Sequence, residues 1–166
     1  MREFSARARH FAGALILTWA GTAPGAAAAE IAPATDLAAD LAQVRARGIP
    51  LLVLFSLPDC RYSERLRQEF LYPLLTSPEW RDRVILRQVD LHSARAFTDL
   101  AGRPSTHEKF ATEQRIRLAP TVKLFDAAGR EVTEPLVGLL TPELYGLYLE
   151  HALDDGLARA AVPAPR

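Results

Sequence analysis

The stretch from Leu51 to Ser63, LLVLFSLPDCRYS, constrains the fold more than any other part of the chain. It starts with five apolar residues, Leu51–Phe55, that lie between two prolines, which is typical of a short buried strand. The following residues, SERLRQEFLYPLL, carry leucine and phenylalanine at helical spacing. The sequence therefore predicts that a strand ends and a helix begins at the only cysteine, Cys60.

This position gives the Cys60 sulfur a physical reason to ionise. A helix N-terminus presents unpaired N–H groups and a partial positive charge, and both favour a thiolate. Arg61 can add positive charge and Ser63 can donate a hydrogen bond, whereas Asp59 opposes them with a negative charge. The alternatives at these positions are a small buried cysteine, an ordinary solvated arginine and a helix-start serine without a redox role.

The remainder of the chain alternates predicted helices and strands, which indicates a sheet with parallel members covered on both faces. A final hairpin, with Gly129 in its turn, makes that sheet mixed. Pro73 is expected to kink or end the helix after Cys60. The expected strands are Leu51–Phe55, Val84–Leu91, Thr121–Phe125 and Glu131–Val137, and the expected helices start near Asp36, Cys60, Ser77, Thr106 and Thr141. The apolar face of the last helix is expected to consist of Leu144, Leu147, Tyr148 and Leu153. The segment Ser93–Ser105 has no assigned secondary structure.

The first 29 residues read as a secretory signal peptide. Three arginines precede a short apolar core, FAGALILTWAG, and four alanines then offer a cleavage site before Glu30. The alternative is an N-terminal membrane anchor. Residues 30–35 are then a linker, 36–155 the folded domain and 156–166 a C-terminal tail. A bacterial periplasm is the expected destination, where oxidising conditions would leave a single cysteine buried, paired with another molecule or kept reduced for a purpose.

Several classes of function find no support in the sequence. The formal net charge is zero, which gives no reason to expect nucleic-acid binding. The histidines are scattered, and no glycine-rich phosphate loop is present. We therefore expect neither a metal centre nor a bound cofactor.

Two segments together resemble the thioredoxin family. One is the strand–turn–Cys60–helix unit, and the other is RIRLAPTVKLF at 115–125, in which Pro120 takes the position of the family's cis-proline. The resemblance covers about 36–155 and is closest to secreted bacterial thioredoxin-like proteins. It implies an α/β, thioredoxin-like three-layer sandwich with a mixed central sheet of about four strands. It also implies that Cys60 is the nucleophile and that Ala119, Pro120 and Thr121 form a substrate-docking edge. The alternative for Pro120 is a strand-start proline that only shapes the loop.

The chain departs from the family pattern at positions that matter for redox chemistry. The dithiol motif becomes Cys60-Arg61-Tyr62-Ser63, so a serine replaces the resolving cysteine. The position of the family's buried carboxylate is Leu54, and that of the tryptophan before the cysteine is Asp59. Net oxidation or reduction by one unaided chain is therefore not expected.

Three hypotheses of function follow. The first is a periplasmic thiol protein that acts through Cys60 alone, by monothiol or isomerase-like chemistry on protein or glutathione thiols. The second is a redox-inactive binding or chaperone-like module that uses the groove beside Pro120. The third is a permanent intermolecular disulfide through Cys60, including a homodimer.

Overall fold

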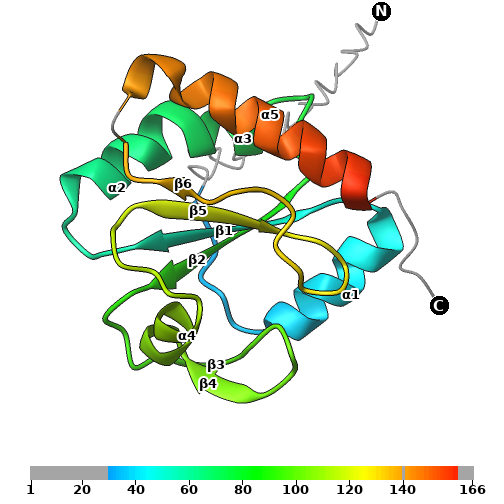
Figure 1. Ribbon diagram of the computed structural model, residues 1–166, viewed down its shortest axis with the longest axis vertical. Helices are drawn as coiled ribbons and strands as arrows, with labels where there is room; N and C mark the ends of the chain where they lie inside the picture. The colour runs from blue at the N-terminus through cyan, green and yellow to red at the C-terminus, as the bar shows by residue number, and fades with distance from the viewer. Residues whose placement is uncertain (1–29, 140, 161–166) are drawn as a thin grey trace, which may run out of the picture.

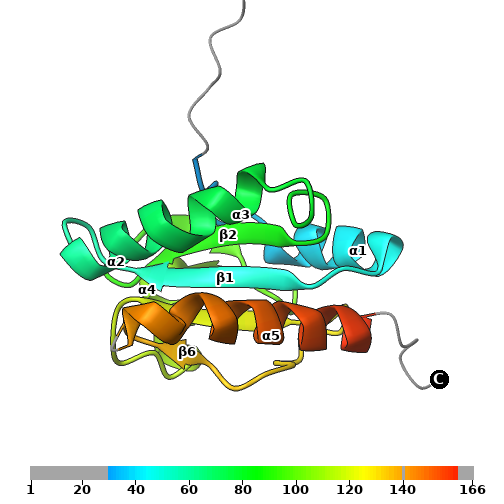
Figure 2. The same cartoon turned by 90° about the horizontal axis from the view of Figure 1, so that it is seen from above.

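A computed structural model describes residues 30–139 and 141–160 of the chain; the predicted signal peptide at 1–29 and the tail residues 161–166 lie outside them. A four-stranded sheet forms the middle layer, with helices on both faces (Figures 1 and 2). The elements are α1 (Leu37–Arg47), β1 (Leu51–Ser56), α2 (Arg61–Leu66), the π-helical turn η1 (Arg67–Leu71), α3 (Tyr72–Thr76), β2 (Ile85–Asp90), β3 (Ala96–Thr98), β4 (Pro104–Thr106), α4 (His107–Glu113), β5 (Thr121–Phe125), β6 (Leu136–Val137) and α5 (Pro142–Ala160).

The sheet has the strand order β2-β1-β5-β6 and is mixed. Strand β1 pairs in parallel with β2, from Leu51 opposite Ile85, and antiparallel with β5, where Phe55 lies opposite Thr121. Strands β5 and β6 are antiparallel. The predicted α/β three-layer sandwich with a mixed sheet of four strands is therefore confirmed.

Every residue of β1 is buried, because both faces of this strand carry packed helices. Its even-numbered leucines, Leu52 and Leu54, belong to the core beneath α3 and α5, while Leu51, Val53 and Phe55 belong to the core beneath α1 and α4. Alternation of side chains along a strand explains why an unbroken apolar run was needed here.

The expected linker at 30–35 is part of the fold. The Ala34 N–H donates to the Gln88 carbonyl at 2.8 Å, and the Gln88 N–H donates to the Ala32 carbonyl at 3.0 Å. These bonds cover the outer edge of β2, a position at which an unpaired edge would otherwise invite association. Asp36 then caps α1 as predicted, because its carboxylate accepts from the Ala39 N–H at 2.9 Å.

Pro73 does not end its helix. The preceding turn, η1, widens so that the Tyr72 N–H bonds to the Arg67 carbonyl five residues back. A proline has no N–H to donate and its ring crowds the carbonyl four residues earlier, so a π-helical turn just before it relieves both problems. The helix continues to Thr76.

Other predicted elements are wrong in detail. No helix starts at Ser77, where the chain makes turns instead. The last strand is only Leu136–Val137, with one isolated bridge between Glu131 and Phe125, because the chain leaves the sheet between them. The unassigned 93–105 segment contributes β3 and part of β4, which pair as a small separate sheet. Helix α5 runs to Ala160, past the boundary expected at 155.

The apolar face predicted for α5 is also wrong. The residues that face the core are Tyr145, Leu149, Ala152, Leu153 and Gly156, whereas Leu144, Leu147 and Tyr148 are exposed. Only Leu153 of the predicted set is buried. The helix has apolar residues on more than one side, so helical spacing alone did not identify the side that packs on the sheet.

Two turns of the chain share the sequence pattern Asp-x-x-Gly-Arg and the same geometry. In the hairpin turn, one Asp126 oxygen accepts from the N–H groups of Ala128 and Arg130, and the other accepts from the Arg130 guanidinium at 2.8 Å. Asp99 makes the equivalent three bonds with Ala101 and Arg103. Burial raises the pKa of each carboxyl, but these hydrogen bonds and the arginine charge lower it by a larger amount. The pKa of each carboxyl therefore lies below its ordinary value.

The glycine of the hairpin turn can be tested by substitution. Gly129 has a φ of 73°, and a Cβ added there would lie 3.2 Å from Leu41 Cδ1. Gly129→Ala is expected to lower the free energy of unfolding by about 2 kcal/mol, from backbone strain and crowding together. Gly48→Ala is the matched control, since Gly48 has a φ of 64° and open space around it, and should cost about 1 kcal/mol. Equal losses in urea denaturation would exclude the crowding.

A second prediction concerns the Asp126 carboxylate, whose contribution to the free energy of unfolding should depend on pH. Because its folded pKa is depressed, its contribution to stability is present above the unfolded pKa of about 3.9 and is lost as the pH falls through the folded pKa. Asp126→Asn should cost roughly 1–3 kcal/mol at neutral pH, and this cost should shrink below about pH 4. Asp82→Asn, at an exposed carboxylate, is the control and should change little at any pH. A cost of Asp126→Asn that is independent of pH would contradict the assignment.

Candidate functional site

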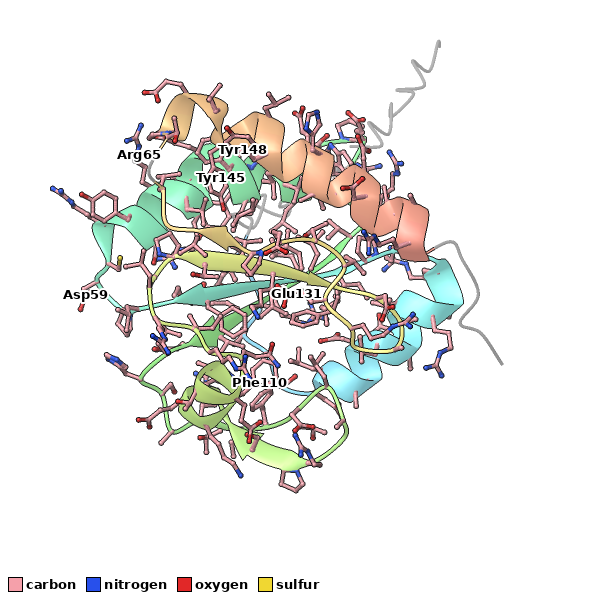
Figure 3. The ribbon with its side chains drawn as sticks, viewed as in Figure 1. Asp59, Arg65, Phe110, Glu131, Tyr145 and Tyr148 are labelled. Carbon is pink, nitrogen blue, oxygen red and sulfur yellow. The ribbon has the colours of Figure 1, made fainter. Side chains whose placement is uncertain are left out.

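Cys60 lies where β1 passes into α2, at the N-cap of the helix. Its carbonyl accepts the first helical hydrogen bond, from the Glu64 N–H at 2.9 Å. The residue before it, Asp59, has a φ of 56°, a left-handed conformation that aspartate tolerates better than most residues. Figure 3 shows the labelled Asp59 at one end of the molecule, beyond the end of β1. The turn thus brings the half-buried cysteine to the surface at the start of a helix.

The environment of Cys60 favours the thiolate. Burial raises the pKa of the thiol, but hydrogen bonds from the Ser63 hydroxyl and from the N–H groups of Ser63 and Tyr62 lower it, as does the positive charge of Arg67. Together, the contributions that lower the pKa exceed the effect of burial, so the pKa of Cys60 lies below that of an ordinary cysteine. A larger fraction of the sulfur is therefore in its nucleophilic form at neutral pH.

The Ser63 hydroxyl is fully buried, and apart from its interaction with the Cys60 sulfur it has no hydrogen-bond partner among the described residues. A buried hydroxyl without a partner costs free energy. The sulfur of Cys60, three residues earlier on the same helix face, is the acceptor that this hydroxyl can serve, and a thiolate accepts more strongly than a thiol. The serine in the position of a resolving thiol therefore stabilises charge on the cysteine but has no sulfur to attack it.

The guanidinium that acts on Cys60 is Arg67 rather than the expected Arg61. The Arg61 side chain lies over the Tyr62 ring, 4.7 Å from its centroid, and donates to the Tyr62 hydroxyl at 2.7 Å. Arg67 is mostly buried between α2 and β2, where it bonds Glu64 at 2.7 Å and Gln88 at 3.3 Å. The signal in the sequence was its spacing, since residues 60, 63 and 67 share one helix face.

No acidic side chain lies under the cysteine on β1. Leu54 is fully buried and faces the core shared with α3 and α5, opposite Gln88 on β2 and Val122 on β5. An ionised group at this position would lose its hydration without an ion partner. Leu54 therefore contributes packing and offers no proton acceptor.

The second part of the site is the start of β5. The Ala119–Pro120 peptide bond is cis, and the pairing of Thr121 with Phe55 sets Pro120 beside the turn that carries Cys60. The Pro120 carbonyl accepts from the Gly138 N–H at 2.7 Å, and the Thr121 hydroxyl donates to the Leu118 carbonyl at 2.7 Å. No hydrogen bond within the described residues uses the Ala119 backbone. Its N–H and C=O groups are therefore available to an incoming extended segment.

A groove of about 380 Å³ extends from Ala119 toward α4. Leu57, on the turn before Cys60, forms one wall, and Leu118 forms the other with 48% of its surface exposed. His92, Glu108 and Arg117 lie at the rim. The groove offers apolar surface next to the cis-proline, with charges of both signs around it.

The remaining candidates have structural roles or stand alone. His107 is buried, where its Nδ1 accepts from the Asp90 N–H at 3.2 Å and its Nε2 lies 2.8 Å from the Ala34 carbonyl, to which it can donate. Within residues 30–139 and 141–160, no three acidic, histidine or cysteine side chains come together as metal ligands. Among the helices of that part of the chain, none combines the length and apolar character that a membrane crossing requires.

Comparison with known proteins identifies the family. The family model described as a thioredoxin-like domain matches residues 37–153, which is more than half of the chain. Among solved structures, Trxlp from Edwardsiella tarda EIB202 is 23% identical, with 72% of this chain and 98% of that chain covered and a TM-score of 0.52. A thioredoxin-fold protein from Helicobacter pylori is 19% identical, covering 69% and 80%, with a TM-score of 0.50.

A third structure, described as DsbH oxidoreductase, is 15% identical over 76% of this chain and 88% of that chain, with a TM-score of 0.51. At these identities the likeness shows a shared fold. No protein of curated function matches the sequence significantly.

The role assigned to Ser63 can be measured. Ser63→Ala is expected to raise the pKa of Cys60 and to slow its alkylation by iodoacetamide at pH 7, because the hydroxyl no longer donates to the thiolate. Arg67→Met should act in the same direction and Arg61→Met should have a smaller effect. The measurement is the midpoint of the alkylation rate against pH in the folded protein. An unchanged midpoint in Ser63→Ala would refute the role of the hydroxyl.

Proposed function

The chain belongs to the thioredoxin-like domain family, and from this premise we propose that it exchanges thiols and disulfides through one nucleophilic cysteine, Cys60. The observation that carries the proposal is the lowered pKa of a half-buried Cys60 at a helix start, beside a cis-proline. A thiolate is the form of cysteine that attacks disulfides. The substrates are protein disulfides or glutathione disulfides, and no cofactor takes part.

The first step joins the protein to its substrate. The Cys60 thiolate attacks one sulfur of a substrate disulfide, so that a new S–S bond forms between them and the second substrate sulfur leaves as a thiolate. One disulfide is broken and one is made, so no external electrons are needed. The product is a mixed disulfide on Cys60.

The second step needs a thiol from elsewhere. In a dithiol enzyme the second cysteine of the motif would attack the mixed disulfide, but Ser63 has only an oxygen at that place. A thiol of glutathione, of the substrate itself or of another protein attacks instead. It forms a disulfide with the bound sulfur and releases the Cys60 thiolate. The chemistry is therefore monothiol or isomerase-like, and the mixed disulfide is long-lived.

The substrate is held as an extended segment. The free N–H and C=O groups of Ala119 can pair with it as a neighbouring strand would, with Pro120 and Thr121 fixing the edge. Leu118 and Val137 are exposed near this edge, and the groove between Leu118 and Leu57 can take an apolar side chain of the substrate. Because the edge offers apolar contacts and backbone hydrogen bonds, it can hold substrate segments of many different sequences.

We also propose that the mature protein works in a bacterial periplasm. The basic residues, apolar core and alanine cleavage site at 1–29 support export. The periplasm is kept oxidising, so it supplies disulfides for Cys60 to attack.

A binding or chaperone-like module remains the second candidate, and a particular observation favours it. Leu54 and Ser63 occupy the places where the family carries a buried acid and a second sulfur, so two groups used in turnover are missing. Under this alternative the groove beside Pro120 holds extended segments and Cys60 does not react.

The lifetime of the mixed disulfide tests the proposal. The chain incubated with glutathione disulfide is expected to gain one glutathione on Cys60 by mass spectrometry, and the adduct should persist until a thiol is added. Ser63→Cys should clear the adduct without added thiol and should gain insulin-reducing activity of at least about tenfold over the natural chain. Ser77→Cys, outside the site, should do neither.

Two results would count against this function. Absence of an adduct on folded Cys60, where the unfolded chain reacts, favours the binding module. A stable dimer joined through Cys60 on a non-reducing gel favours a permanent intermolecular disulfide. If Ser63→Cys alone fails, with the adduct still formed by the natural chain, either the missing acid at Leu54 or a diverged groove accounts for the loss of turnover.

A further inference from the structure

A second surface lies apart from the Cys60 site, along one flank of α5. A hollow of about 620 Å³ runs between this helix and the loop that joins the hairpin turn to β6. We call it the α5 groove. Its loop wall is formed by residues 131–136, and Tyr148 and Glu131 mark the two walls in Figure 3. The helix wall is a row at helical spacing, Tyr148, His151, Asp155 and Arg159. Leu144 does not line the hollow but lies one helical turn before Tyr148.

One end of the α5 groove is apolar and exposed. Leu144 has 43% of its surface exposed and Tyr148 has 47%, although the sequence predicts both on the buried face. Pro135 and Leu136 lie on the opposite wall. Neighbouring large apolar residues that remain in water on a folded domain are a mark of interaction sites.

The other end carries unneutralised negative charge. Glu131 is paired with Lys123 at 3.0 Å, but Glu134 and Asp155 have no ion partner among the described residues. The groove is lined by three carboxylates, Glu131, Glu134 and Asp155, and by the guanidinium of Arg159. Because Lys123 neutralises Glu131, the groove keeps an excess of one negative charge, although the whole chain has no formal net charge.

We propose that the α5 groove binds an extended segment of a partner protein in which apolar and basic side chains follow one another. An apolar side chain packs between Tyr148 and the Pro135 wall, and an arginine or lysine pairs with Glu134 and Asp155. The exposed Tyr148 ring also offers a face to a guanidinium.

Charge decides between a partner and a second copy of this chain. Two copies that met through the α5 groove would oppose the same excess of carboxylates, and like charges facing each other weaken association. A basic segment neutralises the excess instead. None of the groove residues belongs to the Cys60 site, so this inference stands independently of the proposed chemistry.

The test uses a defined probe, a capped tetrapeptide of alternating leucine and arginine, titrated into the ¹⁵N-labelled full chain. Saturable NMR shifts are expected at residues 131–136 and along α5, without matching shifts at Cys60 and Ala119. Replacing the arginines by citrulline, which is neutral and nearly the same shape, should weaken binding about fivefold. Glu134→Gln combined with Asp155→Asn should have a similar effect.

Asp154→Asn is the matched control, because this carboxylate is exposed on α5 but does not line the groove. It should change the affinity by less than about twofold. Equal binding of the arginine and citrulline peptides, or an equal loss in Asp154→Asn and the double variant, would overturn the charge-based recognition. Shifts confined to the Cys60 side would overturn the site. Concentration-dependent dimerisation through Leu144 and Tyr148 without peptide would make the occupant a second copy.

Discussion

The burial of β1 on both faces is the constraint on which the rest of the structure depends. This strand pairs with β2 and β5 at once and contributes side chains to both cores, so its register fixes the positions of four helices. The register also fixes the site. Phe55 lies opposite Thr121, and the turn after β1 therefore meets the cis-proline at the start of β5. Two stretches separated by about sixty residues become neighbours through backbone pairing alone.

The chemistry of the site depends on two replacements within the thioredoxin pattern, Ser63 for the second cysteine and Leu54 for the buried acid. A helix start, local N–H groups and Arg67 favour negative charge on Cys60, against the cost of its partial burial. Ser63 adds a buried hydroxyl donor where a second sulfur would stand. Under the proposed chemistry, Ser63 both supports formation of the nucleophile and leaves release of the product to a thiol from another molecule.

Sequence reasoning failed where one local pattern was compatible with two arrangements. Leu144, Leu147 and Tyr148 have helical spacing, but a second set led by Tyr145 and Leu149 has it too, and only docking on the sheet selects between them. Arg61 is next to Cys60 in sequence, yet it stacks on Tyr62, while the charge of the more distant Arg67 lowers the pKa of the thiol. Pro73 was expected to kink or end its helix; a π-helical turn does precede it, but the helix continues to Thr76.

The sequence by itself determined the α/β class, the helix caps at Asp36 and Thr106, the buried β1 strand and the placement of Cys60 at a strand-to-helix turn. These features depend on residues close together in the chain, whose spacing and hydrogen-bonding capacity are visible in the letters. Tertiary structure alone decided which flank of α5 faces water, which arginine serves the thiol, and that residues 32–34 close the edge of β2. Each of these depends on distances between distant segments, which packing sets and local periodicity does not encode.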